Sequence, residues 1–151
     1  MDVPWPIIRN TLGHFHPALV HFPVGLVLAG AILEGWCVLK RKAASDLART
    51  LLVLGLLGAA GAVTSGLALF RPEDFRDRVL AAAHVHRLLG LAAAGLLVPA
   101  ALAGGWPGRV ELRGRRLWIY RLLYGAAGGL VGLAGHYGGW IVFGWGKIWT
   151  L

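Results

Sequence analysis

Residues 17–39 read PALVHFPVGLVLAGAILEGWCVL, an apolar stretch interrupted only by His21 and Glu34. A run of about 18 or more apolar residues is long enough to cross the hydrocarbon core of a bilayer as a helix. The same character returns three times along the chain, at residues 47–70, 79–103 and 117–143. Short connections make neighbouring helices antiparallel. The sequence therefore predicts an all-α integral membrane protein, an up-down-up-down four-helix bundle.

The composition agrees with a membrane protein and excludes several other classes. Of the 151 residues, 57% are hydrophobic and only 15% are charged, too few for the surface of a soluble domain. We expect an interfacial N-terminal segment at residues 1–16 and one transmembrane domain at residues 17–151. Cys37 is the only cysteine, which excludes an internal disulfide, an iron–sulfur cluster held by this chain alone, and covalent haem attachment through C-x-x-C-H.

The basic residues predict the orientation of the bundle. The net charge is +8, and the basic residues gather around the connection of the first and second spans (40–49) and around that of the third and fourth (109–121). These two connections lie on one side, so topology explains the charge and nucleic acid is not expected as a partner. The positive-inside rule places this side in the cytoplasm. We expect a multi-pass protein of the bacterial inner (cytoplasmic) membrane, surrounded by lipid, with both termini in the periplasm.

The histidines gather at the opposite side. They lie at the start of the first span, early in the third and near the end of the fourth: His14, His16, His21, His84, His86 and His136. An ionisable side chain inside a span indicates function by default. Imidazoles that reach one depth from different helices suit a b-type haem held by two histidines. A zinc or copper site would instead need three or four ligands around one point. Glu34, at the other end of the first span, either pairs with a basic residue or serves a proton path.

Helical angles select among these histidines. His16 and His21 are five residues apart, about 140° around a helix, and His84 and His86 are about 160° apart. His16 and His21 are therefore not expected to bind one small metal ion together, and only one of His84 and His86 is expected to face inward. Because the first and third helices are diagonal in the bundle, we expect His21 and His86 to hold a flat ligand from opposite sides, with His84 as the alternative on its helix. The remaining expected contacts are His136 and His16, as a second ligand pair or as contacts to a quinone or a propionate, and Arg87, as a propionate partner.

Three motifs lie at these positions: HPALVHFP at residues 16–23, HRLLG at residues 86–90 and GHYGG at residues 135–139. In this order they resemble the DUF2231 family of small bacterial membrane proteins, over nearly the whole chain. Family members resemble haem-binding membrane domains and can occur alongside Rieske or cytochrome c modules. The resemblance implies redox work, with His16, His21, His86 and His136 as the family's histidines.

The favoured function is therefore a membrane electron-transfer protein or subunit. It would bind one or two b-type haems through histidine pairs and link a quinone pool to a periplasmic carrier such as a cytochrome c or Rieske-type protein. We expect a non-catalytic or accessory subunit of an oxidoreductase, within a larger complex or a homo-oligomer. Two alternatives stay open: a structural or assembly subunit without cofactor, and a histidine-based zinc or copper protein.

Overall fold

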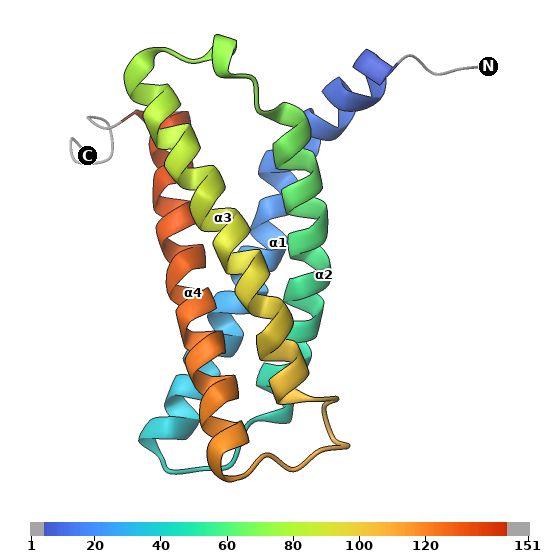
Figure 1. Cartoon of the computed structure of the whole chain (residues 1–151), viewed down its shortest axis with the longest axis vertical. Helices are drawn as coiled ribbons and strands as arrows, with labels where there is room; N and C mark the ends of the chain where they lie inside the picture. The colour runs from blue at the N-terminus through green and yellow to red at the C-terminus, as the bar shows by residue number, and fades with distance from the viewer. Residues whose placement is uncertain (1–4, 145–151) are drawn as a thin grey trace.

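Four long helices make up the protein. The computed structural model describes residues 5–144, which form four α-helices and one short 3-10 helix and no strand (Figure 1). Each α-helix contains a stretch that is long and apolar enough to cross a membrane. The predicted all-α membrane bundle is confirmed. The elements are α1 (Trp5–Leu39), α2 (Asp46–Leu69), η1 (Pro72–Asp74), α3 (Asp77–Gly104) and α4 (Gly114–Phe143).

The helices form two hairpins that pack into one bundle. α1 packs mainly against α2, and α3 packs mainly against α4, while smaller contacts join α1 to α4 and α2 to α3. This order places α1 and α3 on one diagonal of the bundle. In Figure 1 the two hairpins diverge toward the end where α1 begins and α4 ends. The predicted up-down-up-down arrangement is therefore confirmed. Side chains of two diagonal helices can meet across the centre of the bundle.

The largest difference from the predicted spans is at the start of α1. The other three helices begin and end within a few residues of their predicted limits, whereas α1 begins at Trp5 and not near Pro17. Pro17 and Pro23 both lie inside the helix. Each removes one backbone hydrogen bond, a loss that packing against neighbouring helices tolerates in membrane bundles. His16 consequently lies within a regular helix. Residues 1–4 of the expected interfacial segment and residues 145–151 of the expected transmembrane domain lie outside the described residues.

The apolar core lies in the half of the bundle nearest the α1–α2 and α3–α4 connections. Its largest fully buried side chains include Tyr120, Tyr124, Leu52 and Leu97. Tyr124 fits there because Gly30 of α1 has no side chain, since a Cβ at that position would overlap the tyrosine hydroxyl. The hydroxyl donates to the Ala48 carbonyl, 3.3 Å away. This half of the bundle is therefore tightly packed, and the histidines lie in the other half.

A buried ion pair ties α1 to α4 at the same end. The Glu34 carboxylate accepts a hydrogen bond from Arg121 Nε at 2.8 Å, and both side chains are less than a tenth exposed. Glu34 also accepts from the Ser45 backbone N–H at 3.1 Å and from the Tyr120 hydroxyl at 3.4 Å. Arg121 also donates to the Lys42 carbonyl at 2.8 Å. Of the two expected roles for Glu34, the structure shows the pairing with a basic residue.

Candidate functional site

Two histidine rings from diagonal helices meet near the end of the bundle where α1 begins. His16 of α1 and His86 of α3 have ring centroids 6.3 Å apart, and their planes are almost perpendicular, at 82°. Both side chains are half-buried. Histidines from the first and third helices therefore lie at the same depth in the bundle, as the sequence predicted. The structure, however, pairs His86 with His16 and not with His21.

The rotation of α1 about its own axis explains why His86 pairs with His16 and not with His21. Because α1 is a continuous helix from Trp5, His16 and His21 point about 140° apart. His16 faces the bundle interior, so His21 lies on the outer surface, where its Nδ1 is bonded to the Pro17 carbonyl of its own helix. The angle between the two histidines was predicted correctly. Which of them faces inward was not, because that depends on how α1 packs against α2.

His16 is held by α2, a helix without histidine. Its Nδ1 lies 3.0 Å from the Ser65 hydroxyl, which is almost completely buried. The ring also lies directly against Gly66, where a Cβ would come within 2.7 Å of His16 Cε1. The missing side chain at Gly66 thus provides the space that the imidazole occupies.

His86 is held by α4. Its Nδ1 lies 2.8 Å from the Ala134 carbonyl oxygen. A carbonyl can only accept, so Nδ1 carries the hydrogen and the Nε2 of the neutral ring carries the lone pair. Gly138 lies against the same ring, and a Cβ there would be 3.2 Å from His86 Cε1. All four helices therefore contribute to the histidine pair.

The other candidate residues lie around this pair. His84 is exposed, with its ring 5.2 Å from that of Phe70. Arg87 lies over the same phenylalanine, its Cζ 4.4 Å from the ring centroid. His136 lies on the outer surface of α4, with its ring 5.8 Å from that of Tyr137. His14 is also exposed.

The donor set of the site is limited to two imidazoles. Among the described residues, no three His, Cys, Asp or Glu side chains are grouped so that they could hold a metal ion. Protein zinc sites use three or four side-chain ligands. The arrangement at His16 and His86 is therefore better suited to a metal centre with two protein ligands than to a zinc site.

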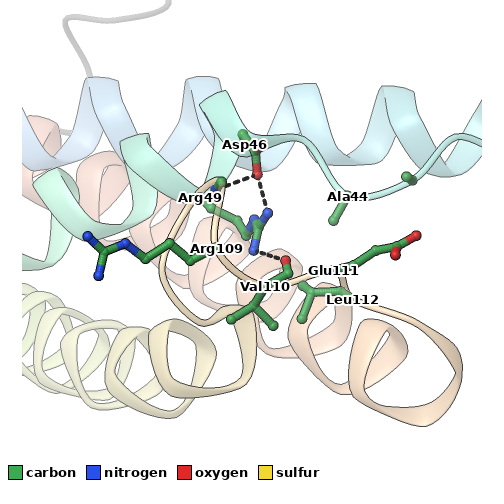
Figure 2. Close-up of a pocket in the computed structure, with 9 residues that line it drawn as sticks. Ala44, Asp46, Arg49, Arg109, Val110, Glu111 and Leu112 are labelled. Atoms are coloured by element: carbon green, nitrogen blue, oxygen red, sulfur yellow. Dashed lines mark hydrogen bonds and ion pairs between the residues drawn. The ribbon is translucent and has the colours of Figure 1, made fainter.

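An open pocket of about 410 Å³ lies at the opposite end, beside the α1–α2 and α3–α4 connections. Arg49 is buried there and donates to the Gly104 and Val110 carbonyls, at 2.9 and 2.8 Å, and to the Asp46 carboxylate. Figure 2 shows Arg49 directed at Asp46 and Val110, while Arg109 points away from them. The polar groups of this pocket hold the α3–α4 connection against the start of α2. In the sequence Arg49 is one of the basic residues of the 40–49 connection, and nothing there signals this contact.

A comparison with protein families defines the relationship of the chain. The model of a family described as "Predicted membrane protein (DUF2231)" matches residues 13–147. The chain belongs to the DUF2231 family. The match includes all three motifs at residues 16–23, 86–90 and 135–139, so the resemblance found in the sequence is confirmed. Neither the curated proteins nor the solved structures gave a significant match.

The groups that hold the two histidines in this DUF2231 protein could not be identified from the sequence. Ser65 lies in a span without histidine, and no sequence signal marks its hydroxyl as a histidine partner. Gly138 lies within the GHYGG motif, and the Ala134 carbonyl is one helical turn before it. Because a backbone carbonyl has no sequence signature, only the register of α3 against α4 reveals that contact.

Proposed function

We propose that this DUF2231 protein is a membrane electron-transfer protein or subunit that binds b-type haem, which His16 and His86 would hold. The observation that carries the proposal is the approach of these two imidazoles from diagonal helices, with centroids 6.3 Å apart. Two imidazoles that bind one metal ion from opposite sides, each through a nitrogen at about 2.0 Å, have centroids about 6 Å apart. The spacing supports ligation of one iron by both rings.

The hydrogen bonds of the pair support the same role. Each ring engages a protein group through Nδ1, His16 at Ser65 and His86 at Ala134. Metal-binding histidines usually bond their second ring nitrogen to a carbonyl, carboxylate or water, which orients the ring and makes the ligand more basic. In this chain that leaves Nε2 of each ring for the iron. A haem iron with two imidazole ligands supplies one-electron transfer.

The position of the pair suggests where electrons would enter and leave. The site lies at the end of the bundle away from the arginine-rich connections. The positive-inside rule assigns those connections to the cytoplasm, and therefore the site to the periplasmic side of the inner membrane. Both termini are proposed to lie on that side. A quinone in the bilayer and a periplasmic cytochrome c or Rieske-type protein are the proposed redox partners, within a larger complex or a homo-oligomer. His21 and His136 are retained as ligands of a second haem or as quinone contacts, and Arg87 as a propionate partner.

Absorption spectroscopy tests the proposal on the full-length protein. The chain is expressed with ample haem supply, purified in detergent, and measured by reduced-minus-oxidised spectra and pyridine haemochrome per chain. One haem per chain is expected for the single pair. His16→Ala and His86→Ala should each lose it. His14→Ala and His84→Ala are matched controls, because each is an exposed histidine two residues away on the same helix, and they should keep it.

The outcomes separate the competing functions. Absence of a Soret band in the wild-type protein would overturn the haem proposal. Zinc or copper found by elemental analysis in such a preparation would favour the metal-binding alternative. If the protein lacks both, and His16→Ala and His86→Ala change only its stability, the structural or assembly role is favoured. Two haems per chain, one of them lost in His21→Ala or His136→Ala, would assign those residues to a second pair.

A further inference from the structure

We infer that Ser65 is a positioning residue that directs the ring hydrogen of His16 to Nδ1, so that Nε2 is the nitrogen available to a metal. The inference rests on the proposed function, since it concerns a ligand of the same site. Ser65 lies on α2, is 1% exposed, and its Oγ is 3.0 Å from His16 Nδ1. A hydroxyl can donate or accept, so this contact alone does not define where the hydrogen of the imidazole lies.

A second hydrogen bond of Ser65 favours one direction. The Ser65 hydroxyl donates to the Ala62 carbonyl of its own helix, with an oxygen–oxygen distance of 3.1 Å. A serine has one hydroxyl hydrogen, and the Ala62 oxygen can only accept. Because the Ala62 carbonyl takes that hydrogen and also accepts from His16, Ser65 acts as an acceptor toward His16. The hydrogen of the neutral imidazole then lies on Nδ1 and the lone pair on Nε2, the same tautomer that the Ala134 carbonyl imposes on His86.

The two imidazoles are nevertheless held by unequal acceptors. His86 donates to a carbonyl at 2.8 Å, while His16 donates to a hydroxyl at 3.0 Å that is itself a donor. A hydrogen bond at Nδ1 makes an imidazole a more basic ligand, which favours the oxidised, more positively charged iron. Ser65 should therefore lower the reduction potential of a bound haem, and its hydroxyl is the group through which α2 would act on that potential.

The test compares Ser65→Ala with Thr64→Ala. Thr64 is the adjacent residue, its hydroxyl makes the same kind of bond to its own helix, at the Ala60 carbonyl, and its side chain is exposed. The tautomer is read from the two ring ¹⁵N signals of His16 in cofactor-free, full-length protein, identified by their absence in His16→Ala. We expect the Nδ1–H form in the wild type. Ser65→Ala should lower the ratio of Nδ1–H to Nε2–H forms about two- to tenfold, the equivalent of one neutral hydrogen bond.

A redox measurement on the haem-loaded protein gives an independent readout. Ser65→Ala should raise the reduction potential by up to about 60 mV, since a tenfold change in relative affinity for the two oxidation states corresponds to about 59 mV for one electron. Thr64→Ala should not change it. Ser65→Cys, which keeps the volume but offers a weaker acceptor, should fall between the wild type and Ser65→Ala.

Failure of this inference is distinct from failure of the proposed function. A wild-type His16 with its hydrogen on Nε2 would overturn the inference, because Ser65 would then be the donor. An identical tautomer ratio in Ser65→Ala and Thr64→Ala would overturn it as well, even with haem bound. If no haem binds at all, the proposed function fails, while the ¹⁵N measurement still decides whether Ser65 positions His16.

Discussion

Replacing Gly66 with alanine should displace His16 and weaken the site. The added Cβ would lie 2.7 Å from His16 Cε1, whereas ordinary contacts begin at 3.4 Å, so the ring must move by about 0.7 Å to reach an ordinary contact. The ring cannot move away from α2 without lengthening its 3.0 Å contact with Ser65. The substitution therefore disturbs both the packing and the orientation of the imidazole.

The expected size of the effect follows from these two changes. Overpacking of a filled interior costs about 1–3 kcal/mol, and the better helix propensity of alanine returns up to about 1 kcal/mol. A net loss of about 1–2 kcal/mol corresponds to about 2–8 °C in melting temperature for a chain of this length. Changes in the groups that orient a metal ligand typically weaken metal binding about 10- to 100-fold. We expect haem affinity to fall within that range.

Gly61→Ala is the matched control on the same helix. Gly61 is exposed, and a Cβ there would meet nothing within 4 Å. That variant should be unchanged or up to about 1 kcal/mol more stable, because alanine loses less backbone entropy in a helix. Both variants are measured by thermal unfolding in one detergent and by haem titration. Equal melting temperatures and equal haem affinities for Gly66→Ala and Gly61→Ala would refute the packing of His16 against α2.

Three further predictions concern other contacts. Gly138→Ala should weaken haem binding less than Gly66→Ala, because its Cβ would lie 3.2 Å from the nearest imidazole atom, and Gly139→Ala, with open space, should leave the spectrum unchanged. Glu34→Ala leaves a buried arginine without its partner and should lower the free energy of unfolding by about 3–5 kcal/mol in a denaturant titration. Glu111→Ala, in an exposed ion pair, should cost about 1 kcal/mol or less. Arg49→Ala removes the donor to two carbonyls at the α3–α4 connection, so limited proteolysis there should become faster.

Each of these predictions can fail in a specific way. Equal loss of haem in Gly138→Ala and Gly139→Ala would show that α4 does not contact His86 as described. Equal destabilisation by the two glutamate variants would mean that the ion pair at α1 and α4 is solvated. An unchanged cleavage rate in Arg49→Ala would mean that this arginine does not hold the α3–α4 connection.

The sequence by itself determined the class of the protein and most of its fold. Hydrophobicity and span length are local properties of the chain, and a bilayer of fixed thickness converts them directly into helices that cross it. The four spans, their antiparallel order and the convergence of histidines from the first and third helices at one level were predictable for this reason. The motifs at residues 16–23, 86–90 and 135–139 were sufficient to find the family.

Only the tertiary structure decided which side chains meet. The sequence defines the 140° between His16 and His21, but the rotation of α1 about its own axis is set by its contacts with α2. Gly58 lies against Phe22 and Pro23, and Gly66 lies against His16. These close approaches turn His16 inward and His21 outward. The sequence also located the basic residues on one side, yet the burial of Arg49 and Arg121 depends on partners more than 50 residues away along the chain. The rotation of each helix and its register against its neighbours depend on the packing of all four helices. The histidine pair and its partners on α2 and α4 could therefore be identified only from the tertiary structure.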